Sequence, residues 1–147
     1  MYTHLLVATD GSKLSAKAVT HAVALAQALS ARITLFYASP DYPMPAFSDG
    51  VIYDPVSRKE YGALAAKEAQ RILAPLKTKA EAGGIECDTL HAVAAAPWEA
   101  ILAAARKAKC DAIVMASHGR RGLTAVLLGS ETQKVLTHCK LPVLVVR

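Results

Sequence analysis

The sequence predicts an α/β fold, in which helices cover both faces of a five-stranded parallel sheet. Two observations support this prediction. Short apolar segments alternate with longer segments of helical periodicity, in the order βαβαβαβαβ. Most of the short segments are strongly apolar, as parallel strands are when helices bury both sides of the sheet. The length of 147 residues suits a single domain spanning 1–147.

The first part of the chain contains two expected strands and one helix. The strands are residues 2–9 and 33–37, both rich in apolar and β-branched side chains. Between them, Asp10-Gly11-Ser12 ends the first strand and caps a helix that reaches about Ser30. An apolar face at steps of three and four marks that helix, formed by Ala18, Ala22, Leu25 and Leu29.

A proline-rich segment, 40–56, follows the second strand. It is too polar and broken for regular structure, and loops of this length are usually functional or mobile. A long helix is expected over about 57–82, which Pro75 should kink or split. Gly83-Gly84 stops this helix, and 85–93 form a third strand that is less apolar and nearer a sheet edge. The expected inward side chains of the helix are Tyr61, Leu64, Ala65, Ile72, Leu73 and Leu76.

The last part of the chain continues the alternation. Pro97 suits the first turn of a helix, residues 111–117 form a fourth strand, and 142–146 form the fifth. Ser130 with Gln133 fits a capping box for the last helix. The whole arrangement is Rossmann-like. The helix that begins near Pro97 should have an apolar stripe at Ile101, Ala105 and Ala108, and the last helix should have one at Val135, Leu136 and Cys139.

Composition narrows the classes of function. No run of about 18 uninterrupted apolar residues occurs, so we expect no membrane partner. The formal charge of +5 favours anionic ligands but is weak evidence for nucleic acid, which we do not expect as a partner. Cys87, Cys110 and Cys139 are far apart and fit buried thiols in a reducing cytoplasm better than a disulfide framework. Because the N-terminus also lacks signal-peptide features, we expect a cytoplasmic protein.

The stretch 111–139 has the pattern of a phosphate-binding element. A buried strand leads into a loop with Gly119 and Gly122, and Gly129-Ser130 opens a helix. Free backbone N–H groups and the positive end of a helix dipole bind phosphate in such elements. The alternative is ordinary turn chemistry, because glycine serves wherever φ is positive. The strand before the loop and the helix after it favour phosphate binding.

Ligands of parallel sheets bind beyond the carboxyl ends of the strands, where the strand order reverses. For the order 3-2-1-4-5, that point lies between the first and fourth strands, so Asp10 and the glycine loop should converge there. The Asp10 carboxylate could accept from a ribose hydroxyl, or hold a cation that bridges phosphates. Alternatively, it only caps the first helix. Arg120 and Arg121 either add contacts to phosphate or form a solvated surface pair.

Several other chemistries are excluded or demoted. The chain contains neither GxxxxGK[ST] nor GxGxxG, so it is neither a P-loop hydrolase nor a carrier of the dinucleotide fingerprint. Its histidines have no metal-ligand spacing. Catalysis by Ser117 with His118 is not favoured, because adjacent side chains at a strand end should point to opposite sides and no GxSxG elbow is present. A phosphorylation receiver would need an acidic neighbour for Asp10 and a lysine after the fifth strand, whereas Lys140 precedes it.

Four segments of the sequence resemble the universal stress protein family. They are LLVATDGS, VAAAPWEAILAAA, SHGRRGLTAVLLGS and LPVLVVR, and the resemblance covers nearly the whole chain. Nucleotide-binding members of the family carry G-x2-G-x9-G-[ST]. Gly119, nine intervening residues and Gly129-Ser130 match this pattern, while Ala116 stands at the first glycine.

The resemblance implies strand order 3-2-1-4-5 and a bound adenine nucleotide, usually ATP, accompanied by Mg²⁺ or Mn²⁺. It implies that the phosphates lie on Gly119, Gly129 and Ser130, and that Asp10, the one candidate protein ligand of a cation, meets the ribose or phosphates. By the same resemblance Ala8 and Thr9 flank the base, and Tyr37 lies near the adenine. The predicted nucleotide-binding set is Ala8, Thr9, Asp10, Tyr37, Met115, Ala116, His118, Gly119, Arg120, Gly129, Ser130 and Glu131.

Ala116 allows two interpretations. If its backbone has a conformation that only glycine reaches easily, alanine costs about 1–2 kcal/mol. If its backbone is ordinary β, one methyl group should weaken nucleotide binding without abolishing it.

The resemblance also implies a homodimer through the last strand, Pro142 to Val146, where pairing would cover an apolar sheet edge. We expect a stress-response protein that senses or signals through its nucleotide and does not turn it over rapidly. One alternative is a dimeric interaction protein whose pocket is closed by Ala116 or by 40–56. Another is slow ATP hydrolysis or autophosphorylation at Ser117, Thr124 or Ser130.

Overall fold

The computed structural model describes residues 1–43, 46–48, 51–53, 56–119 and 128–147. Seven strands and four helices lie in these ranges. In chain order they are β1 (His4–Ala8), α1 (Lys13–Leu29), β2 (Arg32–Ser39), β3 (Ala46–Ser48), β4 (Val51–Tyr53), α2 (Arg58–Ala82), β5 (Cys87–Val93), α3 (Pro97–Lys107), β6 (Ala112–Ala116), α4 (Ser130–His138) and β7 (Val143–Val146).

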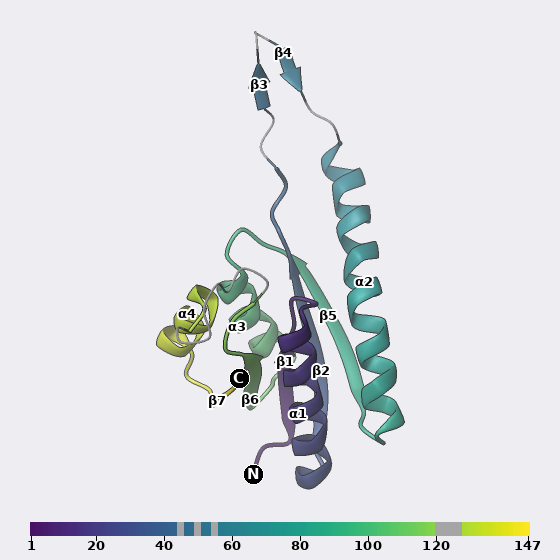
Figure 1. Cartoon of the computed structure of the whole chain (residues 1–147), viewed down its shortest axis with the longest axis vertical. Coiled ribbons are helices and arrows are strands. Elements are labelled where there is room, and N and C mark those ends of the chain that lie inside the picture. The colour runs from purple at the N-terminus through teal and green to yellow at the C-terminus, as the bar shows by residue number, and fades with distance from the viewer. Residues whose placement is uncertain (44–45, 49–50, 54–55, 120–127) are drawn as a thin grey trace.

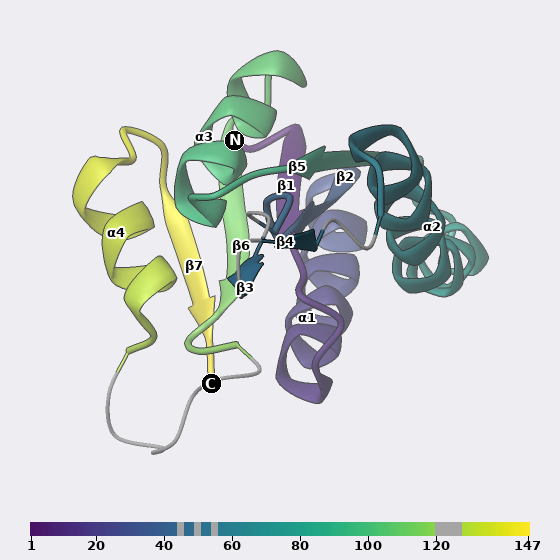
Figure 2. The same ribbon diagram turned by 90° about the horizontal axis from the view of Figure 1, so that it is seen from above.

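Five of the strands form one parallel sheet in the order β5-β2-β1-β6-β7. When only these five strands are numbered, in chain order, the order across the sheet is 3-2-1-4-5, so the predicted topology is confirmed. Figure 2 shows α1 and α2 on one face of the sheet and α3 and α4 on the other. The strand order reverses between β1 and β6, and the carboxyl ends of these two strands define the predicted binding edge.

The core forms two layers because the side chains of each central strand alternate between the two faces. In β1, Leu5 and Val7 pack toward α1 and α2, while Leu6 packs toward α3 and α4. The face of α1 against the sheet is built from small residues, including Ala18 and Ala22, which have no exposed surface. Small side chains let α1 approach the sheet closely, which fixes the turn that joins β1 to α1.

Regular structure within 40–56 is the largest departure from expectation. The strands β3 and β4 form a separate antiparallel pair with Ala46 opposite Tyr53, so the prediction of an irregular segment is wrong. Figure 1 shows this hairpin extending beyond the sheet and beyond the start of α2. Strands of three residues are too short to show a period of two in the sequence, and the surrounding prolines hide them further.

The helix α2 also differs from expectation in two respects. It runs from Arg58 to Ala82 without a break, and Pro75 lies exposed inside it. Ile72 and Leu73 are buried just before the proline and Ala80 after it, so packing on both sides holds the helix together. Leu64, expected to point inward, is 57% exposed.

Exposure of Leu64 follows from where α2 lies. The first turns of α2 extend past the end of the sheet, as Figure 1 shows, and no strand of the main sheet in the described residues covers them there. In α4, Leu136 is likewise 41% exposed and not an inner residue, whereas Val135 is fully buried as expected.

The three cysteines are free thiols, and Cys87 and Cys110 are buried. Burial raises the pKa of each of these two thiols to about 11, which keeps them protonated and unreactive at neutral pH. Within the described ranges, no helix combines the length and the apolar character that a membrane crossing requires.

Candidate functional site

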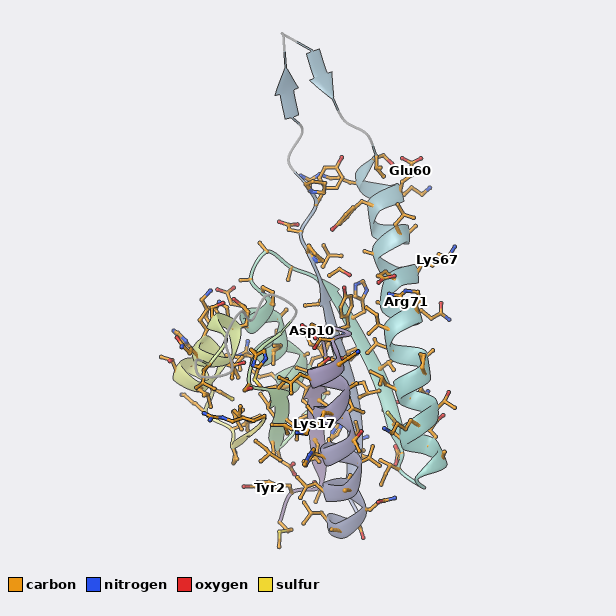
Figure 3. All side chains as sticks on the ribbon, viewed as in Figure 1. Tyr2, Asp10, Lys17, Glu60, Lys67 and Arg71 are labelled. Atoms are coloured by element: carbon orange, nitrogen blue, oxygen red, sulfur yellow. The ribbon has the colours of Figure 1, made fainter. Side chains whose placement is uncertain are left out.

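The turn between β1 and α1 presents Asp10 at the carboxyl edge of the sheet. Ser12 is the N-cap of α1, because its hydroxyl accepts from the backbone N–H of Ser15 at 3.1 Å. The Asp10 carboxylate accepts from the backbone N–H of Ser12 at 2.9 Å and therefore shapes the turn without capping the helix. Gly11 has φ +78°, a conformation that side-chain-bearing residues rarely adopt. Figure 3 shows Asp10 at the start of α1.

Thr9, immediately before Asp10, is buried beneath the first turn of α1. Its hydroxyl lies 2.9 Å from the hydroxyl of Ser15, and its backbone N–H donates to the carbonyl of Phe36 at 2.9 Å. Thr9 is 7% exposed, so it belongs to the rigid floor under Asp10. Its contacts extend the β1–β2 pairing by one residue past β1 and hold the turn in place.

Ala116, the residue at the first motif glycine, is the last residue of β6 and is 7% exposed. Among the described residues other than glycine, positive φ occurs at Ser30 and Lys109 alone. Ala116 therefore has ordinary extended backbone, and the interpretation in which alanine forces a strained conformation is wrong. Its methyl group packs in the core cluster on the α1 side of the sheet.

Gly119 and Asp10 lie against each other across the strand-order reversal. A Cβ atom built on Gly119 would fall 2.5 Å from Oδ2 of Asp10, closer than any side chain can sit. Any other residue at 119 would therefore displace the Asp10 carboxylate. The structure brings together these two residues, which the sequence placed 109 positions apart.

Gly129 brings the start of α4 to the end of β6. Its backbone N–H donates to the carbonyl of Ser117 at 2.8 Å. A Cβ atom at Gly129 would lie 3.1 Å from Cα of His118, which leaves almost no room for a side chain. Thr132, in the first turn of α4, reinforces the junction by donating its hydroxyl to the carbonyl of Ala116 at 3.0 Å. This last contact was not predicted from the sequence. A threonine in the first turn of a helix could have indicated it, because such hydroxyls often bond to nearby backbone groups.

The N-cap of α4 is Gly129 and not Ser130, so the predicted capping box is wrong. Ser130 is already the first helical residue and is exposed. The Gln133 amide donates instead to the carbonyl of Leu128 at 3.1 Å. The first turn of α4 consequently has no side-chain cap, and its backbone N–H groups lie at the positive end of the helix dipole.

Ser117 and His118 form a hydrogen-bonded pair. Oγ of Ser117 lies 3.1 Å from Nδ1 of His118, so the expectation that these side chains diverge is wrong. The strand β6 ends at Ala116, and beyond it the alternation of a pleated strand no longer determines side-chain direction. Ser117 is 5% exposed, which places its hydroxyl beneath the surface of the site.

Four other predicted residues serve the core or lie elsewhere. Tyr37 is 6% exposed in the core on the α1 and α2 side, where its ring stacks on His91 with centroids 6.1 Å apart. Burial lowers the pKa of His91, whose Nε2 lies 2.8 Å from the Ser39 hydroxyl. Ala8 and Met115 are buried on the α3 and α4 side. Arg120 lies outside the described residues, as do Arg121, Gly122 and Thr124.

Glu131 joins the starts of two helices. One carboxylate oxygen accepts from the backbone N–H of Trp98, in the first turn of α3, at 2.9 Å. The other oxygen forms an ion pair with Lys134 at 3.2 Å. Glu131 therefore supplies an acceptor that Ala96, the N-cap of α3, does not provide. No sequence pattern predicts this contact, because Glu131 and Trp98 lie 33 residues apart.

A model of the universal stress protein family matches residues 1–147. The chain belongs to the universal stress protein family. Universal stress protein YxiE of Bacillus subtilis is 34% identical over 149 residues, and the match covers all of both chains. The solved structure of UspA from Lactobacillus plantarum matches with a TM-score of 0.80 and 25% identity, covering 99% of this chain and 98% of that one. A universal stress protein solved in complex with cAMP matches with a TM-score of 0.70 and 28% identity, covering 99% of this chain and 97% of that one.

Proposed function

We propose that this universal stress protein binds an adenine nucleotide, ATP, in the crevice between the carboxyl ends of β1 and β6. The observation that carries the proposal is the close approach of Gly119 to Asp10 at the sheet edge, together with the approach of Gly129 to Ser117 and His118 just before Gly119. Both glycines occupy places where a Cβ atom would meet protein atoms, so only glycine lets these segments of the sheet edge approach one another so closely. The proposal treats the whole chain as one binding domain.

Each part of this edge has a chemical counterpart in the nucleotide. The uncapped first turn of α4 offers N–H donors and a positive dipole to the phosphates. The Asp10 carboxylate offers acceptors to a ribose hydroxyl. Ala116 should weaken binding without abolishing it, because its backbone is unstrained and its methyl group is packed in the core. The cAMP complex of a 28% identical relative supports the choice of an adenine nucleotide.

A divalent cation, Mg²⁺ or Mn²⁺, would accompany the triphosphate. Within the described residues, no group of three or more His, Cys, Asp or Glu side chains could hold a metal alone. Asp10 fits the usual magnesium arrangement, in which one or two carboxylates share the ion with phosphate oxygens. When bound, the cation would supply positive charge between Asp10 and the phosphates.

The groups at this edge are suited to binding ATP without hydrolysing it rapidly. Ser117, the side chain hydrogen-bonded to His118, is 5% exposed and therefore poorly placed as a phosphate acceptor. We accordingly propose a cytoplasmic sensing or signalling role in the stress response. Phosphate release from ATP should be no faster than in a Gly129→Val variant, in which a side chain would collide with the backbone of His118.

The proposal includes a homodimer through β7. The carbonyl of Pro142 accepts from the backbone N–H of Ile113 in β6, and the carbonyl of Val146 accepts from that of Ser117, just past the end of β6. Because successive residues of a strand face opposite neighbours, the N–H and C=O groups of Val143 and Val145 point to the open edge. The four residues of β7 are all apolar, and Leu144 is 45% exposed. Pairing with β7 of a second copy about a two-fold axis would cover this unprotected apolar edge. Val145→Pro, which removes an outward N–H, should yield monomers in sedimentation velocity, whereas Val145→Ala should stay dimeric.

Calorimetry with ATP and Mg²⁺ tests nucleotide binding directly. A ligand at 100 times its dissociation constant should stabilise the fold by about 2.7 kcal/mol, which thermal unfolding would detect. Gly119→Ala should lower the affinity for ATP by about tenfold or more. The added methyl group would displace the Asp10 carboxylate from the ribose, and losing one hydrogen bond to a charged group costs about 1.5–3 kcal/mol. Gly62→Ala is the matched control, since a Cβ atom at Gly62 meets nothing within 4 Å. Absence of heat and of stabilisation at millimolar ATP would overturn the proposal.

A further inference from the structure

A cavity opens at the amino end of the main sheet, the end opposite to Asp10 and Gly119. Residues of β1, β2 and β5 line it together with the carboxyl end of α3. Figure 2 shows α3 on this face of the sheet. The volume of about 410 Å³ lies within the range of small-molecule sites. The cavity therefore lies outside the site proposed for the nucleotide.

His4 and Thr34 are the buried polar residues of this cavity. They are 4% and 2% exposed, and Nε2 of His4 lies 2.7 Å from the Thr34 hydroxyl. The other ring nitrogen of His4, Nδ1, is buried and has no hydrogen bond of normal geometry among the described residues, although the carbonyl of Ala108 lies near the ring. Buried polar atoms are rarely left without a partner, so Nδ1 is suited to a polar group of a ligand that enters the cavity.

The His4 ring is held in its neutral form. Burial lowers the pKa of His4, and the Arg32 guanidinium lowers it further, and these effects outweigh those of nearby carboxylates such as Asp88. A neutral imidazole has one donor nitrogen and one acceptor nitrogen. Because the Thr34 hydroxyl can accept from Nε2, Nδ1 is then the acceptor. An acceptor at this position matches a ligand group that donates hydrogen bonds, such as an ammonium.

Asp88 and Lys107 bring opposite charges to the cavity from different elements. Asp88 lies in β5, and Lys107 is the last residue of α3. Both are exposed, and within the part of the chain that the structure describes neither forms an ion pair. Arg32 differs from them, because its guanidinium already faces the Glu86 carboxylate at 3.9 Å. One carboxylate and one ammonium group, which do not pair with each other, therefore face the same cavity.

We propose that this cavity binds a small zwitterion, a free α-amino acid. The carboxylate of the ligand meets the Lys107 ammonium, and the ammonium of the ligand meets Asp88 and Nδ1 of His4. Leu90, which is half-buried against the core layer of α3, lines the cavity and offers an apolar surface to the ligand side chain. Asp88 would repel a purely anionic ligand and Lys107 a purely cationic one, whereas a zwitterion complements both. The proposal rests neither on nucleotide binding nor on pairing through β7.

Thermal unfolding of the full chain with each of the twenty standard amino acids, at millimolar concentration, tests the proposal. At least one of them should raise the melting temperature, because a ligand that binds only the folded state stabilises it. Calorimetry with that amino acid should then give one site per chain. The same compound without its amino group, and the same compound without its carboxyl group, should each bind at least about tenfold more weakly.

The two charged residues of the cavity allow matched variants. Asp88→Asn and Lys107→Gln should each lower the affinity for the amino acid by about tenfold or more, because each loses a hydrogen bond between charged groups. Asp41→Asn and Lys67→Gln make the same changes at exposed residues that do not line the cavity, and the affinity should stay the same in both. His4→Phe keeps a ring without its nitrogens and should also bind more weakly.

Unfolding curves without ligand separate loss of binding from loss of folding. If His4→Phe does not fold, the variants of the exposed residues Asp88 and Lys107 still decide the question. Failure of all twenty amino acids to stabilise the chain would overturn the proposal. Equal binding of the compound without its amino group, or variants of Asp88 and Lys107 that bind like their controls, would also overturn it. Gly119→Ala should leave amino acid binding unchanged, so the outcome is independent of the nucleotide site.

Discussion

The helices α2 and α4 begin in opposite ways. At the start of α2, the Ser57 hydroxyl accepts from the backbone N–H of Glu60 at 3.2 Å, and the Glu60 carboxylate accepts from the backbone N–H of Ser57 at 2.9 Å. At the start of α4, Gly129 is the N-cap and offers no side chain. Each helix must satisfy the same orphan N–H groups of its first turn. The first does so with its own residues, and the second leaves them to a ligand or to water.

The other two helices follow α2 in this respect. Ser12 caps α1, and Glu131 accepts from the backbone N–H of Trp98 in α3. Among the four helices of the described ranges, α4 alone therefore lacks a side-chain acceptor at its start. Its N-cap, Gly129, lies against Ser117 and His118, the two residues just before Gly119. The comparison separates residues that stabilise the fold from residues that should bind nucleotide.

Ser130→Asp should give the largest effect and the clearest separation. A carboxylate at the first position of α4 would interact favourably with the helix dipole and stabilise the fold by about 0.3–1 kcal/mol. The same charge would repel phosphate, and two like charges about 4 Å apart near a protein surface cost about 4 kcal/mol. We expect ATP affinity to fall by about a hundredfold or more in calorimetry while the melting temperature rises. Ser130→Asn is the neutral control, and equal losses in both variants would contradict a phosphate at this position.

Glu131→Ala should have its main effect on stability. Losing a hydrogen bond to a charged acceptor costs about 1.5–3 kcal/mol, here the bond from the backbone N–H of Trp98. Denaturant unfolding should show this loss, whereas ATP affinity should change less than tenfold. Glu131→Gln keeps an acceptor and should recover part of the stability. A large loss of ATP affinity with unchanged stability would instead make Glu131 a nucleotide-binding residue.

Ser57→Ala should cost about 1 kcal/mol of unfolding free energy, the usual effect of removing an N-cap hydroxyl. Because Ser57 caps α2, far from the junction of β6 with α4, ATP affinity should stay the same. Denaturant unfolding with and without ATP measures both quantities. Ser57→Asp, which retains a capping acceptor, should restore stability. Weaker ATP binding in Ser57→Ala would break the distinction between the two helix starts.

The smallest expected effect is a pH dependence of the α2 cap. Hydrogen bonds from Ser57 hold the pKa of the Glu60 carboxyl below its ordinary value of 4.5. A carboxyl whose pKa is lowered by folding contributes stability above its unfolded pKa, and this stability is lost as the pH falls through the folded pKa. The difference in melting temperature between the wild type and Glu60→Ala should therefore be present at pH 7 and shrink below about pH 4.5. A difference that is constant with pH would show that the ionised carboxylate does not strengthen the cap.

The strand order and the meeting of Asp10 with the glycine loop could be predicted from the sequence. The alternation of apolar strands with helices predicts a parallel sheet, and the spacing from Gly119 to Gly129 predicts the phosphate-binding pattern; both are long-range regularities. These regularities do not depend on the conformation of any single side chain. Family resemblance supplied the order of the strands, and the structure confirms it.

Details of one residue or one turn could not be predicted in the same way. The N-cap of α4 is Gly129, one residue before the predicted Ser130, because the position of the cap depends on where the loop backbone enters the helix. Composition does not determine that position. The Ser117–His118 pair forms because β6 ends one residue before Ser117, so a rule for strands no longer applies. Tyr37 points into the core because its position in β2 selects that face of the sheet. In each case a shift of one residue changes the result.

At the base of the β3–β4 hairpin, the Tyr61 hydroxyl donates to the carbonyl of Pro40 and the Tyr42 hydroxyl donates to the carbonyl of Val56. These two contacts close a neck, which makes the hairpin a segment that evolution or protein engineering can exchange. Because the neck contacts fix the two ends of the segment, the chain between them can change in length without moving β2 or α2. Doubling the length of a flexible loop costs only about 0.6 kcal/mol of closure entropy. Epitope tags, binding peptides or the corresponding segments of relatives should therefore be accepted between Pro43 and Val56 with little loss of stability.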